Sequence, residues 1–241
     1  MGVEIINISN LSFSHNNIQV FSDFSLTLAD DAISIIGPNG AGKTTLLKLI
    51  LGVLKPQQGV IQTDGKNIRM CFQDNYLLKE LSVYQNLDII LRPYVHTKID
   101  RNKTILDYLT KFDLLEYMNF YPDSLSMGLK SKVSLIHALI TKPDILLLDE
   151  PFASLDIYNR FQYIDFLKTL LKDTKCQMIL VTHDIDEALL LTKKIVLLTD
   201  KPSNVLFIQN NDKIFDSIDE SAFTEIKNSI LKRVLCERET K

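Results

Sequence analysis

A glycine-rich segment that ends in a lysine and two threonines is the first feature whose residue types could do chemistry. Residues 37–45 read GPNGAGKTT and fit the pattern G-x-x-x-x-G-K-[ST]. They follow the β-branched run Ile33–Ile36 and precede the helix-like segment Leu46–Leu54. Glycines let backbone N–H groups converge on phosphate, and the start of the next helix adds a favourable dipole. The segment predicts a nucleoside triphosphate site, with Lys43 on the β- and γ-phosphates and the Thr44 hydroxyl on Mg²⁺.

Two adjacent carboxylates are the second candidate group. Asp149 and Glu150 follow the continuous apolar run Ile145–Leu148, which is typical of a parallel strand buried on both faces. Ligands of open α/β sheets bind at the carboxyl ends of the strands. One carboxylate could therefore hold Mg²⁺ and the other could activate a water molecule. From these residues alone, a pair of acids that stabilises the start of the next helix explains the pattern about equally well.

Gln73 and His183 also end strand-like runs. Gln73 stands in the segment CFQD, and His183 stands in VTHD. A lone glutamine or histidine in such a place is usually a solvated loop residue. Each is therefore weak evidence by itself.

The elements that must position these groups alternate along the chain. Strand-like runs are separated by helix-length segments, an order that predicts a mostly parallel α/β sheet. These runs are Ile33–Ile36, Ile145–Leu148, Met178–Thr182 and Ile195–Leu198. The turn signal Asp64-Gly65 predicts a hairpin or short meander between Val60–Thr63 and Ile68–Phe72.

Two further segments read as helical. From about residue 84 to 141 the pattern is mostly helical, and one helix is expected to begin after Ser126, a good N-cap. From Ser221 onward, apolar residues recur on one helical face, which predicts a helix docked on its own domain. The residues of this face are Phe223, Ile226, Ile230 and Val234.

Composition limits the class of protein. The chain has 241 residues, 46% of them hydrophobic and 24% charged, with a net charge of −3. These values exclude disorder and argue against a large nucleic-acid surface. No apolar run reaches the roughly 18 residues of a membrane span, and the N-terminal segment lacks a signal-peptide pattern. Cys71, Cys176 and Cys236 fit neither a disulfide framework nor a zinc site. We expect a soluble protein of a reducing compartment.

Taken in chain order, the motifs resemble the nucleotide-binding subunit of ATP-binding cassette (ABC) transporters. They are GPNGAGKTT, Gln73, LSMG, LLLDEP, SLD and His183, and the resemblance runs from about residue 3 to 202. It implies ATP and Mg²⁺ as cofactors. It also implies a P-loop NTPase ABC ATPase fold, with a mostly parallel sheet core, an antiparallel β portion and a helical subdomain.

The resemblance assigns a role to each motif. Glu150 is implied as the catalytic base, Gln73 as the glutamine that touches Mg²⁺ and the attacking water, and His183 as the switch histidine on the γ-phosphate. The implied metal ligands are Thr44, Gln73 and Asp149. The implied ATP-binding residues are Gly37, Pro38, Asn39, Gly40, Ala41, Gly42, Lys43, Thr44, Thr45 and His15. Ser126, Met127 and Gly128 form the signature that faces the ATP of a partner subunit, and Asp156 belongs to the D-loop.

The sequence departs from the family pattern at two of these positions. Met127 stands where the signature usually has glycine, so it must fold its thioether aside or hold its backbone in a less favoured conformation. His15 stands where an aromatic ring usually stacks on adenine. Imidazole can also stack, with less area than tyrosine.

The resemblance further implies a single nucleotide-binding domain over residues 1–241. We expect residues 1–83 and 143–202 to form the ATPase core and residues 84–142 to form the helical subdomain with the signature. Residues 203–241 are expected to form a tail and docking helix.

The function implied is the ATP-binding subunit of an importer, similar to the nitrate, sulfonate and taurine branch. The expected partners are a second copy in a head-to-tail dimer, integral membrane permease subunits and, indirectly, a solute-binding protein, at the cytoplasmic face of the membrane and without nucleic acid. One alternative is a soluble ABC ATPase with no transport role, acting on DNA or ribosomes. A P-loop kinase or GTPase is disfavoured by the absence of an N-K-x-D motif, and a degenerate regulatory cassette by the intact Lys43, Asp149, Glu150 and His183.

Overall fold

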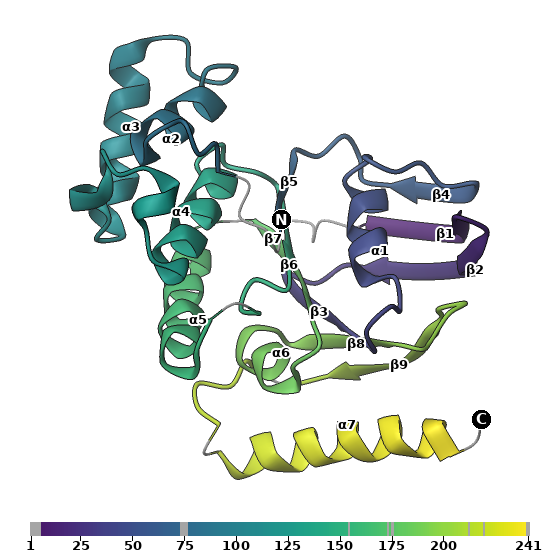
Figure 1. The fold of residues 1–241 in the computed structure, drawn as a ribbon. Helices are drawn as coiled ribbons and strands as arrows, with labels where there is room; N and C mark the ends of the chain where they lie inside the picture. Colours follow the sequence, from purple (N-terminus) through teal and green to yellow (C-terminus); the bar gives the residue numbers. More distant parts are fainter. Residues whose placement is uncertain are drawn as a thin grey trace. The chain divides into compact units, whose positions relative to one another are not determined.

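Strand β3 (Ala32–Ile36) is the centre of one of the two units into which the chain divides in our computed structural model (Figure 1). The structure describes residues 6–72, 77–153, 155–172, 174, 176–211, 213–218 and 220–239. The first unit contains the described parts of 1–65 and 177–241. The second contains the described parts of 66–176.

The first unit has a parallel core of three strands. β3 pairs in parallel with β7 (Gln177–Thr182) and with β8 (Lys194–Leu198). Every residue of β7 is buried, as expected for a strand covered on both faces. β9 (Val205–Asn210) adds an antiparallel edge strand to β8. The strands predicted from the apolar runs in this unit are confirmed.

A separate antiparallel sheet completes the strands of the first unit. Its order is β2-β1-β4, with β1 (Ile6–His15), β2 (Ile18–Leu28) and β4 (Gln58–Gln62). Buried and exposed residues alternate along much of β1, because only one face of such a sheet meets the core.

The predicted hairpin across Asp64-Gly65 is wrong. Both residues have positive φ, 50° and 70°, so a turn does form there. However, β4 pairs antiparallel with β1, and β5 (Ile68–Cys71) pairs in parallel with β6 (Ile145–Asp149) in the second unit. The turn signal reports only the local backbone, whereas pairing depends on partners far away in the sequence.

Three helices belong to the first unit: α1 (Lys43–Ile50), α6 (Ile185–Leu191) and α7 (Ser221–Glu239). α6 packs on β3 and β7, and α7 lies against α6 (Figure 1). Phe223 and Ile230 of α7 are buried, at 2% and 0% exposure. These two apolar residues hold the C-terminal helix on its own unit.

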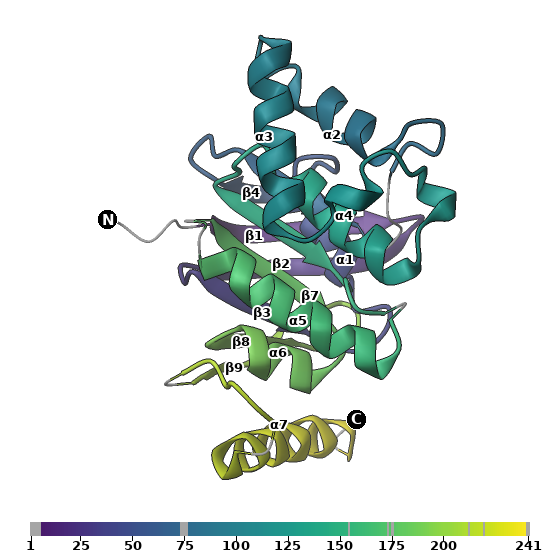
Figure 2. The same ribbon diagram turned by 90° about the vertical axis from the view of Figure 1, so that its left-hand side faces the viewer.

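In its described residues, the second unit combines strands β5 and β6 with four helices and two short 3-10 turns. α4 contacts β5, α2 and α5, and α2 also contacts α3 (Figure 2). Two short 3-10 turns, η1 and η2, connect α3 to α4. The bounds are α2 Val83–Leu91, α3 Lys98–Lys111, η1 Leu115–Tyr117, η2 Pro122–Ser124, α4 Met127–Leu139 and α5 Ile157–Lys172.

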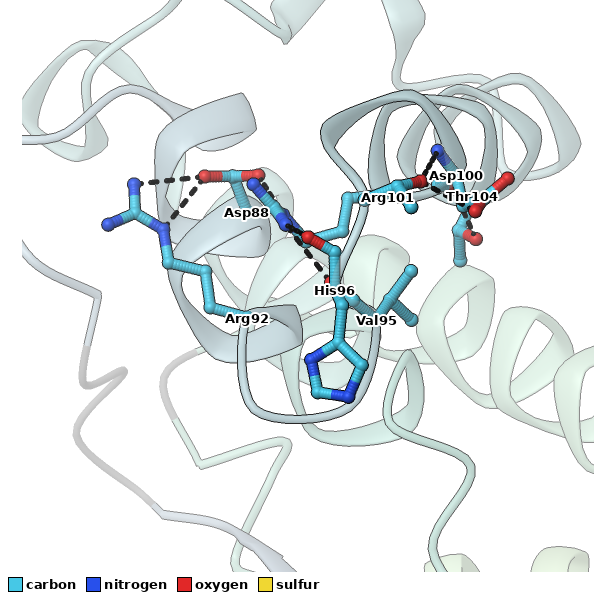
Figure 3. A network of polar contacts seen from close by, with 8 residues as sticks. Asp88, Arg92, Val95, His96, Asp100, Arg101 and Thr104 are labelled. Atoms are coloured by element: carbon cyan, nitrogen blue, oxygen red, sulfur yellow. Dashed lines mark hydrogen bonds and ion pairs between the residues drawn. The ribbon is translucent and has the colours of Figure 1, made fainter.

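A polar network ties α2 to α3 (Figure 3). Asp88 accepts from Arg92 Nη2 at 3.0 Å and from Arg101 Nε at 2.7 Å. Arg101 Nη1 also donates to the carbonyls of Val95 and His96, both at 3.0 Å. Burial alone would raise the pKa of Asp88, but the hydrogen bonds from the two arginines lower it below its usual range. The charged network therefore fixes the connection between the two helices.

The predicted fold class is confirmed. The chain combines parallel strands, an antiparallel sheet and a mostly helical stretch between residues 83 and 139. Among the residues that the structure describes, no helix has both the length and the apolar character needed to cross a membrane.

Candidate functional site

The glycine-rich loop lies between β3 and α1 in the first unit. Gly42 is the N-cap of α1 and has a φ of 92°. A Cβ at Gly42 would lie 2.4 Å from Cγ1 of Val20 on β2, so only glycine fits both the backbone angle and the space. Gly40 also has a positive φ, 87°. These two glycines give the loop its tight curl.

The N-terminus of α1 is suited to an anion. It has no side-chain cap and no acidic residue in its first turn, and the first N–H groups of a helix have no partners within the helix. Lys43 is only 6% exposed. Its Nζ donates to the carbonyls of Gly37 at 2.8 Å and Pro38 at 3.1 Å. The loop thus presents backbone N–H groups and one held ammonium group, which together can bind phosphates.

The register of the parallel strands brings His183 to this loop. Ile36 at the end of β3 pairs with Thr182 at the end of β7. Gly37 and His183 are therefore the next residues on neighbouring strands, at the edge where α/β sheets bind ligands. His183 is exposed. The predicted loop residues that share this edge are Gly37, Pro38, Asn39, Gly40, Ala41, Gly42, Lys43, Thr44 and Thr45.

His15 lies on the hairpin that packs behind the loop. It pairs with Ile18 across the turn Asn16-Asn17, where both residues have positive φ. His15 is exposed, and Val20, two residues after Ile18, is the side chain next to Gly42. The imidazole is accessible to a ligand, and adenine stacking stays a prediction.

The two carboxylates lie at the end of β6 in the second unit. Asp149 is the last strand residue and is 3% exposed, and Glu150 follows with a φ of 45°. A positive φ is uncommon for a residue with a side chain and often occurs at functional turns. Burial raises the pKa of Cys71 on the neighbouring strand to about 11, and the charge of Asp149 adds to this, although a hydrogen bond with Ser134 opposes it. The thiol therefore stays protonated beside the carboxylate.

The signature segment begins α4, as predicted. Ser126 is the N-cap, and its hydroxyl accepts a hydrogen bond from the Leu129 backbone N–H at 3.3 Å. Met127 is the first helical residue and is 47% exposed. It is absent from the described residues with positive φ. Of the two alternatives for Met127, the less favoured backbone is therefore wrong, because the residue lies in the first turn of an α-helix; a thioether folded aside stays a prediction.

The segment after Glu150 connects the carboxylates to the signature within the second unit. Asp156 accepts hydrogen bonds from the Asn159 backbone N–H at 2.9 Å and from its side-chain amide at 2.7 Å. These two bonds lower the pKa of Asp156. A Cβ at Gly128 would lie 3.5 Å from Oδ1 of Asn159. Asn159 therefore lies between the Asp156 turn and the signature.

Two residues that the motifs pointed to fall outside the described residues. They are Gln73, between β5 and α2, and Ser154, in the SLD segment. The predicted roles of Gln73 in metal and water binding stay predictions.

Ser203 supports the phosphate loop and was missed by the sequence analysis. Its hydroxyl donates to the carbonyl of Ala41, and its backbone N–H donates to the carbonyl of Val20 at 2.8 Å. Ser203 is 1% exposed. It is separated from the loop by more than 150 positions in the sequence, so no local pattern could have identified it.

The curled glycine loop, the uncapped helix and the carboxylate pair at a strand end define a P-loop ATPase. The ABC transporter family matches residues 21–153, more than half of the chain. The chain belongs to this family and is an ATPase.

Several relatives cover most of the chain. The taurine import ATP-binding protein TauB of Yersinia pestis bv. Antiqua is 34% identical over 210 residues, covering 84% of this chain and 82% of the relative. The aliphatic sulfonates import ATP-binding protein SsuB of Bacillus licheniformis is 35% identical, covering 88% and 86%. The fold is similar to that of CbiO1 of Clostridium perfringens, part of the ABC transporter complex CbiONQ. Here the TM-score is 0.77 and the identity 24%, over 87% of this chain and 89% of that one.

Replacing Met127 by glycine is expected to raise basal ATPase activity about 5-fold, the effect of about 1 kcal/mol on closure. Met127 is exposed at the start of α4, and the family resemblance predicts that a partner's nucleotide approaches the backbone at this position. Met127→Leu keeps the bulk and serves as the control. Phosphate release by the purified chain measures the effect, and equal rates for all three proteins would show that Met127 is neutral.

Proposed function

We propose that this ATPase powers solute import as one of two copies in a head-to-tail dimer on a membrane permease. The phosphate loop supports the nucleotide site, because an uncapped α1 and the buried Lys43 suit a triphosphate. The import function is supported by the relatives that are named for taurine and aliphatic sulfonate import. The single observation that carries the proposal is the curled loop at the start of α1, in a chain similar to these relatives over most of its length.

The proposal includes Mg²⁺, because two of the predicted ligands have suitable oxygen donors. Asp149 supplies a buried carboxylate and Thr44 supplies a hydroxyl, which are oxygen donors of the kind that Mg²⁺ prefers. The ion would neutralise charge on the phosphates of bound ATP. We assign it to Thr44 and Asp149, with Gln73 as a further ligand.

In the proposed hydrolysis of ATP, each of several residues has a separate role. Lys43 and the N–H groups of residues 37–45 hold the β- and γ-phosphates of ATP. Glu150 accepts a proton from the water that attacks the γ-phosphorus, and His183 contacts the γ-phosphate. The phosphoryl group passes to that water, and ADP leaves with the electron pair of the broken P–O bond.

The second copy completes each site in this proposal. Ser126, Met127 and Gly128 of one copy face the γ-phosphate of ATP on the other, and Asp156 lies in the D-loop of the same interface. His15 stacks on the adenine. The permease, and through it a solute-binding protein, determines the solute, while this chain stays peripheral at the cytoplasmic face of the membrane.

The proposal also divides the chain by role. Residues 1–83 and 143–202 act as the ATPase core, and residues 84–142 act as the helical subdomain that carries the signature. Residues 203–241 act as a tail whose helix α7 docks on α6.

Dimerisation that depends on ATP tests this proposal. The purified chain should be a monomer or weak dimer without nucleotide and should dimerise with ATP and Mg²⁺, because two sandwiched ATP molecules complete the interface. Light scattering after size exclusion measures the mass, with ADP as the matched control. A tight dimer that forms without nucleotide would contradict the sandwich arrangement.

Uptake by cells tests the import function. Deletion of the chain should abolish ATP-driven uptake of labelled taurine or an alkanesulfonate, and the wild-type chain should restore it. If neither solute is affected while the tagged chain still copurifies with a permease, the solute class is wrong. If no permease copurifies, the importer proposal is wrong.

A further inference from the structure

The hydroxyl of Thr182 makes two hydrogen bonds at the end of β7. It donates to a carboxylate oxygen of Glu187 on α6 and accepts from the Asp184 backbone N–H at 3.0 Å. Thr182 is 1% exposed and Glu187 is 5% exposed. Both side chains are therefore buried. The hydrogen bond between Thr182 and Asp184 spans His183, the residue between them in the chain.

A second side-chain turn follows at once. Asp184 is the N-cap of α6, and its Oδ1 accepts from the Asp186 backbone N–H at 2.8 Å. Turns of this kind, in which a hydroxyl or carboxylate bonds a backbone N–H two residues on, fix the local backbone. His183 is flanked by two of them. These bonds fix the backbone on both sides of His183, and so the position from which its side chain projects.

Helix α6, which carries Glu187, is itself anchored in the first unit. At its far end the Thr192 hydroxyl donates to Oγ of Ser34 on β3 at 2.9 Å, and both residues are fully buried. β3 leads directly into the phosphate loop. The Glu187 carboxylate is therefore fixed relative to the strand that carries the loop.

We propose that Thr182 and Glu187 are positioning residues, which hold the backbone of His183 so that its imidazole meets the γ-phosphate. This inference rests on the proposed role of His183. Loss of the Thr182 hydroxyl breaks two hydrogen bonds. The buried Glu187 carboxylate loses a donor, and the Asp184 backbone N–H loses its acceptor. The imidazole then samples several directions, and only a fraction of bound ATP meets it in the reactive geometry.

Thr182→Val tests the inference because it keeps the branched shape and removes the hydroxyl. We expect kcat to fall about 10- to 100-fold, the effect of a misplaced catalytic group, while KM for ATP stays within about 2-fold. Thr182→Ser restores the hydroxyl and should recover most of kcat. Thr141→Val is the control, since it removes a buried, hydrogen-bonded hydroxyl from the second unit, which has no part in this inference. It should lower the melting temperature without the loss of kcat.

His183→Ala separates this inference from the function on which it rests. In that background Thr182→Val should change the residual turnover, followed with labelled ATP, by less than about 2-fold, because residues that act through one another are not additive. If Thr182→Val lowers turnover equally in the wild-type and His183→Ala backgrounds, only the positioning role is overturned. The same holds if Thr182→Val has the wild-type kcat while His183→Ala is impaired. Full turnover of His183→Ala would overturn the assignment of His183 and the inference with it. If Thr182→Val does not fold, Glu187→Leu, which removes the acceptor of the Thr182 hydroxyl, takes its place with the same measurements, and an unchanged kcat would again overturn the proposal.

Discussion

Replacing Glu150 by glutamine is expected to lower steady-state ATP hydrolysis by about 10²- to 10⁴-fold, the usual contribution of a general base. The amide keeps the shape of the side chain but cannot accept the proton of the attacking water. ATP binding should be retained, because the proposed phosphate site is the loop at the start of α1 rather than Glu150. Phosphate release measures turnover, and calorimetry measures binding.

The backbone conformation of Glu150 should be unchanged when glutamine replaces it. Glu150 has a φ of 45°, and a glutamine meets the same conformational cost as the glutamate it replaces. Asp113→Asn provides the control: Asp113 is exposed in the same unit and has a φ of 55°. It loses a carboxylate at positive φ in the same way and should hydrolyse ATP at the wild-type rate. Near wild-type turnover of Glu150→Gln would mean that another group is the base.

The elements around the site could be predicted because their signals are local. The run Ile145–Leu148 is apolar at every position, which is typical of a strand covered on both faces. Ser126 predicted the start of α4 correctly because an N-cap hydroxyl bonds within the next turn. The phosphate loop combined such a strand, a glycine curl and a helix start in one continuous segment.

The features that the sequence did not reveal depend on distant contacts or on the exact backbone. The turn at Asp64-Gly65 exists, but the strands on either side of it pair with β1 and β6 rather than with each other. Likewise, the bond from Ser203 to Ala41 joins segments that no local pattern relates. The less favoured backbone considered for Met127 is missing because the residue is the first of helix α4, which Ser126 caps. Sequence patterns therefore identified the candidate residues, whereas the contacts that support them could be found only in the structure.

Replacing Lys43 by alanine is expected to weaken ATP binding about 10- to 150-fold, as the loss of a hydrogen bond to a charged group implies. The ammonium group lies inside the loop, where it donates to the carbonyls of Gly37 and Pro38. Alanine removes the proposed phosphate contact and also the two hydrogen bonds from Lys43 to the loop. The effect should therefore appear in the dissociation constant, whereas Glu150→Gln changes turnover.

Lys48→Ala is the matched control for charge on the same helix. Lys48 lies in the last turn of α1, five residues after Lys43, so its loss should change helix stability slightly and ATP affinity by less than about 2-fold. Calorimetric titration of each variant with ATP and Mg²⁺ measures the affinity, and thermal unfolding without nucleotide measures any damage to the fold. If Lys43→Ala binds ATP as tightly as Lys48→Ala, the loop does not hold the phosphates. The nucleotide site would then have to lie elsewhere in the chain.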